Sequence, residues 1–484
     1  MGAMSVIRRC WWVGLAGTGA ALAAAACSGG SAAVPSMDGS GTNDGGTGAS
    51  SSGPTYYADV KPILDAKCTL CHTTGGIAPF TLLTYADAKM HAPDIAPAVK
   101  AHVMPPWPPS DTCNQYNGDR SLPQSEIDTI AAWATGGTPE GDPSAYKPLG
   151  GPPLPTLSRV DQTLTMPSPY TPTQRPDDYR CFLLPWTPTT TKYITGFGAK
   201  PGQTSIVHHL LVYQVPPDQI ATYQAYDDAD PGQGYTCFGG PTGSLSANGT
   251  SNGSSGPADA GASSALVLPQ QIGGWVPGNL GSDFAAGTGI KIVPGSMVVL
   301  QVHYNTLNAP PVPDQTEVDF ELADSVDKEA YVLPFTNASW VKDHTMDIPA
   351  GDPDASHSYG VGAGLWASFL TNGAVGGSQP FTLYSTLLHM HLHGTETTLT
   401  LDRGDGTNTC LLDIPHWNFH WQGNYALAQP ITVNPSDQIQ IDCHWDNSAA
   451  NQPVIDGQPM AVTDLNWGEG TTDEMCIGFV YVTK

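Results

Sequence analysis

The first motif able to carry chemistry is CTLCH, formed by Cys68, Cys71 and His72. This C-x-x-C-H arrangement attaches c-type haem, because the two thiols add to the vinyl groups and the next residue is placed to ligate the iron. The alternative is a disulfide beside a chance histidine. The motif predicts one covalently attached haem c.

A sixth iron ligand should come from later in the same region. Met104 in HVMPPWPP is the best candidate, because the prolines that follow fix an extended loop that can present the thioether. His91 and His102 are the rivals. A methionine ligand would raise the reduction potential relative to two histidines, so the choice decides which electron donors are plausible.

A second motif, LLHMHLHG, places His389 and His391 two residues apart. A strand projects such a pair from one face toward a common point, which is a common geometry for metal sites on sheets. His393 falls on the same face, so the spacing leaves open which two of the three bind, and a zinc site of all three is the rival. The sequence has no H-E-x-x-H, which removes the commonest zinc-hydrolase alternative.

A third motif is the adjacent pair His208 and His209 in VHHLLVY. Neighbours in a regular strand point to opposite faces, so the chain must bend there if both are to share one metal. Alone, such a pair is more often one buried and one surface histidine. His303 in LQVHYN is a further candidate, but nothing in the spacing brings it to His208.

The elements that must position these residues change along the chain. Short helical stretches fill residues 55–148, and SLPQSEIDTIAAWATGG predicts a final helix in which Ser121 and Gln124 have capping-box spacing and Gly136 ends the last turn. Beyond the prolines at 152–155, short alternating runs between Gly, Pro and Asn turns are typical of β-sandwiches. We place the division between two such domains within 327–335.

The fold class is therefore multidomain, with a small all-α domain followed by two tandem all-β sandwiches. We expect the all-α domain at 55–148 and the sandwiches at 155–330 and 331–484. The all-α segment resembles small single-haem cytochrome c domains in its CTLCH motif, its Met-bearing loop and its closing helix. A Gly/Ser/Ala-rich tract at 239–264 interrupts the first sandwich; its GTSNG matches the nucleophile-elbow pattern by letters only and is discarded.

The N-terminus predicts export. Residues 1–27 carry Arg8, Arg9, a short apolar run and LAAAAC, which resembles a bacterial lipoprotein cleavage box that would leave a lipidated Cys27. Ordinary cleavage without lipid is the alternative. Residues 28–54 form a flexible Gly/Ser linker. We expect a periplasmic or cell-surface protein, anchored to the outer membrane only through that lipid.

The net charge of the chain makes nucleic acid an unfavourable partner. Asp and Glu outnumber Lys and Arg by 44 to 18, giving a formal charge of −26, which disfavours nucleic acid.

Five strings, in order, carry a family resemblance: VHHLLVY, LQVHYN, HMHLHG, IPHWNFHWQ and DEMCIGFVYV. From about Thr163 to Lys484 the chain resembles the copper type II, ascorbate-dependent monooxygenases, the family of dopamine beta-monooxygenase and peptidylglycine alpha-hydroxylating monooxygenase. The resemblance implies two jelly-roll-like sandwiches, one copper on each, and a solvent-filled cleft between them.

The resemblance also implies two ligand sets. His208, His209 and His303 would hold the electron-transfer copper, and His389, His391 and Met475 would hold the catalytic copper that binds and activates dioxygen. A thioether suits a metal that alternates between Cu(II) and Cu(I), because soft sulfur favours Cu(I). The chain departs from the family in Met390, where a small polar residue is common, and in the additional His393. His416, His420 and His444 are expected in structural roles.

Six cysteines remain after Cys10, Cys27, Cys68 and Cys71 are removed from the ten. The resemblance implies two disulfides, Cys443 with Cys476 and Cys181 with Cys237. Whether Cys113 and Cys410 meet stays open.

These expectations point to a copper-dependent monooxygenase that hydroxylates a C–H bond of an unknown small organic substrate with dioxygen. Its cofactors would be two copper ions and one haem c, with ascorbate or a protein as reductant. We hypothesise that haem delivers electrons to the copper held by three histidines. The alternative is a non-catalytic haem and copper electron carrier or copper-binding surface lipoprotein; an adhesion module would not need CTLCH.

Overall fold

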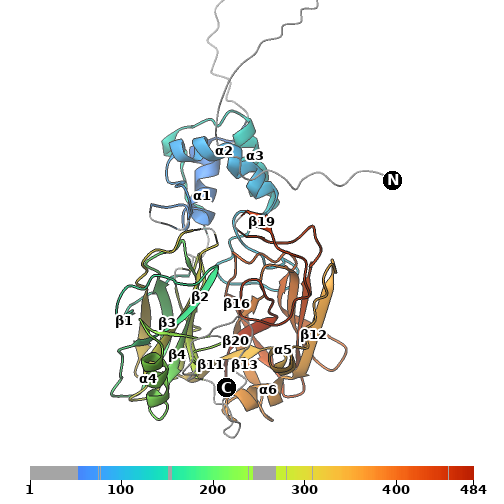
Figure 1. Ribbon diagram of the computed structural model, residues 1–484. Coiled ribbons are helices and arrows are strands. Elements are labelled where there is room, and N and C mark those ends of the chain that lie inside the picture. Colours follow the sequence, from blue (N-terminus) through green and yellow to red (C-terminus); the bar gives the residue numbers. More distant parts are fainter. Residues whose placement is uncertain are drawn as a thin grey trace, which may run out of the picture. The chain divides into compact units, whose positions relative to one another are not determined.

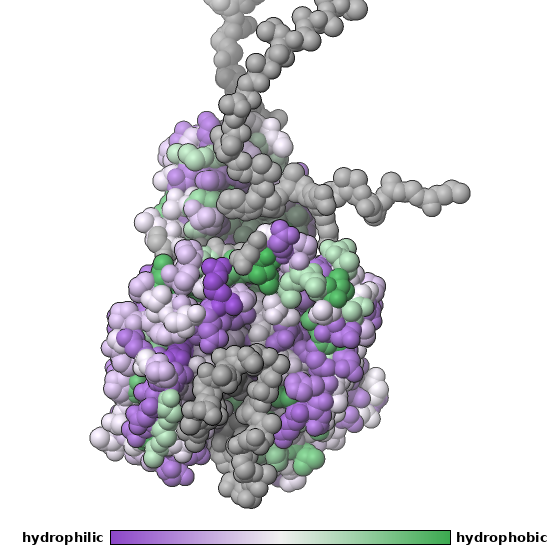
Figure 2. Space-filling model, viewed as in Figure 1, coloured by the Kyte–Doolittle hydropathy of each residue, from purple (hydrophilic) through white to green (hydrophobic). Residues whose placement is uncertain are grey.

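The computed structural model describes residues 53–74, 76, 78–150, 155–237, 239–243, 269–279, 281–307, 309–455 and 457–484. The expected signal peptide, nearly all of the linker and most of the 239–264 tract lie outside these residues. No helix in the described part is both long and apolar enough to cross a bilayer. Hydrophilic residues predominate on the face shown in Figure 2, as the acidic composition predicts.

The named elements within the described residues of 56–145 are all helices (Figure 1). Their core gathers around Tyr56, Leu64 and Trp133, which are almost fully buried. The elements are η1 (Tyr56–Val60), α1 (Lys61–Lys67), α2 (Tyr85–Lys100), α3 (Gln124–Thr135) and η2 (Pro143–Ala145).

The expected final helix is confirmed as α3, but its predicted cap is wrong. The helix ends at Gly136 as expected and buries Ile127 and Ile130. It begins after Pro123, which has φ −62° and ψ 152° and gives no side-chain cap. Proline fixes φ near this value and has no N–H to donate, so it sets the helix start in place of Ser121.

The first sandwich packs two sheets around a core that includes Phe182, Leu300 and Phe320. Its elements are β1 (Gln162–Thr165), β2 (Asp177–Leu184), β3 (Lys192–Lys200), β4 (Val207–Val215), α4 (Ile220–Ala229), β5 (Tyr235–Thr236), β6 (Gln270–Trp275), β7 (Ser282–Asp283), β8 (Thr288–Ile292), β9 (Met297–Asn305) and β10 (Glu317–Ala323). One layer is the sheet β5-β2-β9-β4-β6, and the other contains β1-β10-β3-β8 with β7 beside β3.

The second sandwich has its own core, which includes Phe335, Leu399 and Trp445. Its elements are β11 (Lys328–Phe335), α5 (Ala338–Asp343), β12 (Ala355–Gly362), α6 (Ala363–Leu370), β13 (Phe381–His389), β14 (Gly394–Asp402), β15 (Asn408–Ile414), β16 (Tyr425–Val433), β17 (Gln438–Trp445), β18 (Val454–Ile455), β19 (Gln458–Pro459) and β20 (Ile477–Thr483). The sheet β12-β17-β14-β15 faces the strands β11-β20-β13-β16. The two sandwiches are green and orange to red in Figure 1.

Strand β11 joins the two sandwiches. It pairs with β8 of the first and β20 of the second, so one nine-stranded sheet runs through both. Ala330 packs in the first core, whereas Leu333 and Phe335 pack in the second. The expected division at residues 330 and 331 therefore falls inside a strand that both cores share.

Three disulfides cross-link the chain. Cys443 pairs with Cys476 and Cys181 with Cys237, as the resemblance implied. Cys113 pairs with Cys410, the pairing that the sequence left open. The last bond ties the helical region to β15, 297 residues further along the chain.

Candidate metal centre

A β-bulge turns the adjacent His208 and His209 toward one point. In the pairing of β4 with β9, Val207 faces Tyr304 and His209 faces His303, so His208 is an extra residue on its strand. Such a bulge breaks the alternation of side chains between faces. The two imidazole Nδ1 atoms lie 3.3 Å apart. This is the bend that the sequence required and could not show.

Strand register brings His303 to the same point. It lies directly across from His209, and its Nδ1 is 3.4 Å from the Nδ1 of His209. The candidate ligand atoms of His208, His209 and His303 all lie within 4.8 Å of one another. Three converging ring nitrogens fit a first copper site.

The second set lies where β13 ends. His389 and His391 have ring centroids 5.0 Å apart. His389, the last residue of β13, pairs with Ile477, the first residue of β20, so Met475 lies two residues before the partner of His389. Met475 is 8% exposed, and the Cys443–Cys476 disulfide fixes the residue next to it.

Four of the five candidate ligand histidines are held in the neutral, metal-binding form. Burial lowers the pKa of His389 to about 4. Burial and neighbouring imidazoles lower the pKa values of His208, His209 and His391 well below the ordinary range. A neutral imidazole offers a lone pair to a cation, so these residues need not lose a proton to bind copper at neutral pH.

Hydrogen bonds decide which ring nitrogen each histidine offers. Asp177 Oδ1 accepts from His303 Nε2 at 2.8 Å, which leaves Nδ1 free toward the other two histidines. Ligating histidines commonly donate their other N–H in this way. Asp177 also accepts from Asn305 at 2.9 Å and from the backbone N–H of Thr471. These contacts hold the pKa of Asp177 well below its usual range, although burial opposes them.

In the second set, hydrogen bonds occupy the Nδ1 atoms of both histidines. His389 Nδ1 donates to Gln422 Oε1 at 2.6 Å, and His391 Nδ1 donates to the carbonyl of Asp473 at 3.1 Å. Their Nε2 atoms are therefore the ones left for a metal.

The two sets adjoin, which differs from the solvent-filled cleft that the resemblance implied. The rings of His209 and His389 have centroids 6.0 Å apart. Phe419 stacks on His208 at 4.2 Å and also contacts His391 at 6.0 Å. Phe419 comes from the second sandwich and fills space beside the first set.

His393 has protein partners of its own. It is fully buried, its Nε2 is 3.5 Å from Gln452 Oε1, and its Nδ1 is 3.3 Å from Glu474 Oε1. Glu474 also accepts from the backbone N–H groups of His391 and His393 and from Trp445 Nε1. Glu474 therefore holds the loop that carries His391 and His393 through their backbone N–H groups.

The other histidines of this region lie in structural or exposed positions. His444 Nδ1 is 3.2 Å from Asp354 Oδ1, and His416 and His420 are exposed.

The CTLCH segment follows α1 and fits haem attachment. Cys68 and Cys71 are free thiols, and burial raises the pKa of Cys68 to about 12 and also raises that of Cys71. His72 Nδ1 donates to the carbonyl of Phe80 at 3.0 Å, which leaves Nε2 for iron. Arg120 Nε is buried without a hydrogen-bond partner, and the charge of Arg120 lowers the pKa of Cys71 against burial. A haem propionate is the type of anion that would satisfy such a group.

The three candidates for the sixth iron ligand lie in different surroundings. Phe80 contacts the rings of both His72 and His91, with centroids at 4.6 Å and 3.8 Å. Met104 is half-buried just after α2, and His102 is exposed. The choice of Met104 stays a prediction.

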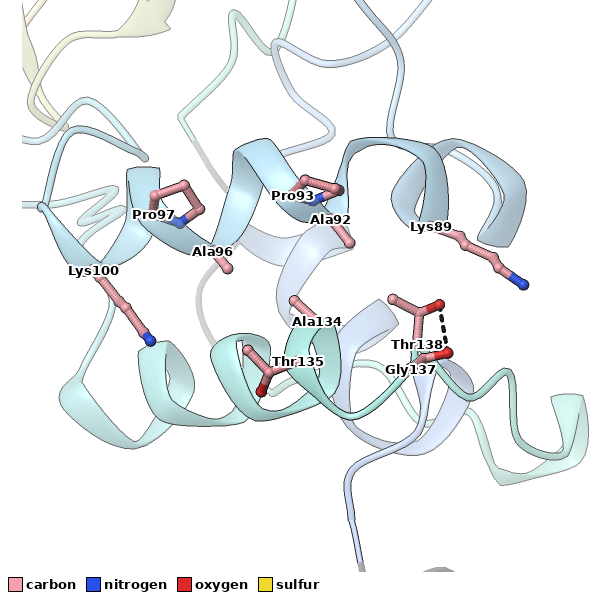
Figure 3. A pocket seen from close by; sticks show the side chains of 10 residues that line it. All are labelled: Lys89, Ala92, Pro93, Ala96, Pro97, Lys100, Ala134, Thr135, Gly137 and Thr138. Atoms are coloured by element: carbon pink, nitrogen blue, oxygen red, sulfur yellow. Dashed lines mark hydrogen bonds between the residues drawn. The ribbon is translucent and has the colours of Figure 1, made fainter. Parts of the chain in front are cut away.

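A groove between α2 and α3 lies elsewhere in this region, with Lys89 and Lys100 at its ends (Figure 3).

Comparison with known proteins gives a family match over the region that contains the second set. Residues 376–483 match the family described as copper type II ascorbate-dependent monooxygenase, C-terminal domain. No curated protein matches the chain. A solved structure of a Paenibacillus xanthan lyase is similar at 11% identity and a TM-score of 0.13, over 70% of this chain and 28% of that one. The family match indicates a copper monooxygenase domain that contains His389, His391 and Met475.

Sequence reasoning missed the groups that orient the ligands, namely Asp177, Gln422, Glu474 and the carbonyl of Asp473. Gln422 stands within IPHWNFHWQ, so that string held a usable signal. Asp177 lies 126 residues before His303, and only the pairing of β2 with β9 brings them together.

Proposed function

We propose that the protein is a copper-dependent monooxygenase that hydroxylates a C–H bond of a small organic substrate with dioxygen. The observation that supports this proposal is a cluster of three imidazoles that adjoins two further imidazoles, His389 and His391, within the matched copper monooxygenase domain. Ascorbate dependence belongs to the matched family, so ascorbate is the first reductant to test.

The residues divide the work by their donor atoms. His208, His209 and His303 would hold one copper through Nδ1, and His389, His391 and Met475 would hold the other. Bound copper supplies one-electron redox steps and a position for dioxygen. The softer, Met-bearing set favours Cu(I), the form that reacts with dioxygen.

The reaction requires two electrons. A C–H bond, one dioxygen, two electrons and two protons give an alcohol and one water. Two metal sets account for this count, one electron held at each. The 6.0 Å between the His209 and His389 rings leaves a short path for the second electron.

The helical region is proposed to supply these electrons. Cys68, Cys71 and His72 would carry haem, and a reduced haem would pass one electron at a time to copper. We also propose that a lipid on Cys27 anchors the protein to the outer membrane. The three disulfides are consistent with a location outside the cytoplasm.

The test is oxygen-atom incorporation. Copper-loaded full-length protein is reduced with ascorbate and mixed with labelled dioxygen and a panel of small molecules bearing activated C–H bonds. We expect one labelled oxygen atom in a product. Carbon monoxide, added to the reduced protein, should bind one copper of the two. A protein that holds copper but neither incorporates labelled oxygen nor binds carbon monoxide would be a non-catalytic electron carrier.

A further inference from the structure

Residues 105–120 of the helical region contact the second sandwich and are here called the docking segment. It begins directly after Met104 and contains Cys113, which is bonded to Cys410 of β15. Ser110 N–H donates to the carbonyl of Asp413 at 2.8 Å, and Asn117 N–H donates to that of Ala426 at 2.8 Å. The segment is thus held by backbone hydrogen bonds and a covalent link.

Aromatic side chains lead from this segment toward the second ligand set. Trp107, three residues after Met104, meets Tyr425 edge-on with centroids 5.4 Å apart. Tyr425 is the first residue of β16 and is 5% exposed. The hydroxyl of Tyr425 lies close to Gly423. A Cβ added to Gly423 would be 2.8 Å from the Tyr425 hydroxyl oxygen. Gln422 is the next residue toward the copper site.

Gln422 completes the connection. Its Oε1 accepts from His389 Nδ1 at 2.6 Å. At the other end, the Arg120 guanidinium lies 5.8 Å from the Trp107 ring. The charge of Arg120 also acts on the Cys71 thiol, so this arginine lies near both the haem-attachment motif and the aromatic pair.

A competing route leads to the three-histidine set and is weaker. Arg120 Nη1 donates to the carbonyl of Gly278 at 3.4 Å, a long hydrogen bond. From Gly278 the path runs back along the chain to Trp275, crosses to Leu210, and only then reaches His209. Electron tunnelling weakens steeply with each through-space step, and this route has no ring contact.

We infer that haem electrons reach copper through Trp107, Tyr425 and Gln422, and enter at His389 of the Met-bearing set. This rests on the proposed function and replaces the sequence-based hypothesis that they enter at the three histidines. In each transfer ferrous haem becomes ferric and one Cu(II) becomes Cu(I), and an external one-electron reductant restores the haem. The first electron would pass on to the three-histidine set across the adjoining His389 and His209 rings, and a second haem electron would then reduce the Met-bearing site.

The experiment follows haem-to-copper transfer in the full-length protein, loaded with haem and Cu(II), after flash reduction of the haem without oxygen. Haem reoxidation and loss of the cupric signal are recorded together. We expect Trp107→Leu to slow both by an order of magnitude or more, and Trp107→Phe to keep most of the rate. Trp186→Leu, which removes a half-buried tryptophan that stacks on Phe320 in the first sandwich, should change neither.

Half-loaded proteins locate the point at which electrons enter. His303→Ala should empty the three-histidine set and leave rapid reduction of the remaining copper. His389→Ala should leave a copper that haem reduces slowly. Unchanged transfer in Trp107→Leu, or rapid transfer in His389→Ala, would overturn the relay while leaving haem supply intact. Failure of the native protein to bind haem, or to pass electrons from haem to copper, would overturn haem supply itself, whereas oxygen insertion driven by ascorbate would still stand.

Discussion

At the scale of single residues, Met475 gives the two candidate copper sites different chemistry. Three imidazoles belong to the first set and two to the second, and the Met475 thioether lies two residues before Ile477, the pairing partner of His389. Sulfur stabilises Cu(I) more than an imidazole does. The site beside Met475 is therefore the one that should hold reduced copper and meet dioxygen.

Met475→Leu should lower the Cu(I) affinity of one site by an order of magnitude or more. Leucine keeps the buried volume and removes the sulfur. Competition with a cuprous chelator measures the change, and Met90→Leu, at a methionine that is 72% exposed, is the matched control. Equal Cu(I) affinities in Met475→Leu and the native protein would remove Met475 from the site.

The buried histidines should make the copper-free protein less stable in mild acid. The pKa of His389 is about 4 in the folded chain, against an ordinary value of 6.5, so below pH 6.5 the unfolded chain binds more protons. Stability is then fully present above about pH 6.5 and falls as the pH drops toward 4, by about 3 kcal/mol for this residue alone. Urea unfolding at several pH values measures it.

His389→Gln should reduce that pH dependence, with His208, His209 and His391 still contributing, and the same change at the exposed His416 should leave it unchanged. A stability that is constant over this pH window would show that the site is open to water or is already protonated in the folded chain.

Some of these residues could be predicted from the sequence and others could not, for a physical reason. The two-residue spacing of His389 and His391 is enough to predict one face of a strand. The approach of His208 to His209 depends on a bulge, and the pairing of His303 with Asp177 depends on register. Neither bulges nor register can be read from the local spacing of residues.

At the scale of elements, the chain from Trp467 to Ile477 positions the second set. Thr471 binds Asp177 across the two sandwiches, Asp473 holds His391, and Glu474 accepts from the loop that carries His391 and His393. The final helix, predicted from its apolar face, was found, but its start was missed because Pro123 dominates the local backbone.

Glu474→Ala should destabilise the protein by about 2–4 kcal/mol, because it leaves several buried N–H groups without an acceptor. It should also weaken copper binding at the second set more than at the first. Chemical unfolding and metal titration measure the two effects. Glu396→Ala, at an exposed position on β14, is the control and should change neither. Equal losses at both copper sites would mean that Glu474 supports the fold in general and not this loop.

At the scale of the whole molecule, two links hold the functional parts together. The nine-stranded sheet joins the sandwiches through β11, and the Cys113–Cys410 disulfide joins the helical region to the second sandwich. Sequence predicted the succession of helical and strand regions. It could not predict that β11 serves both cores, because an acidic stretch with few strand signals gave no reason to place a strand there.

Replacing Cys113 and Cys410 together by serine should loosen the docking segment and lower stability by about 2–4 kcal/mol. Hydrogen exchange should quicken at the amides of Asn117 and Ala428, which bond across this contact. The amides of β17, in the sheet's interior, serve as the internal control. Unchanged exchange at Asn117 would show that the backbone bonds suffice without the disulfide.

The central claim is that two distinct copper sites lie side by side, one of them with sulfur. Metal analysis joined to copper X-ray absorption on the reduced, full-length protein tests it most directly. The proposed function predicts two coppers per chain, all-nitrogen ligation at one, and a sulfur ligand at the other that disappears in Met475→Leu. A protein that takes up a single copper, or two without any sulfur ligand, would contradict the account.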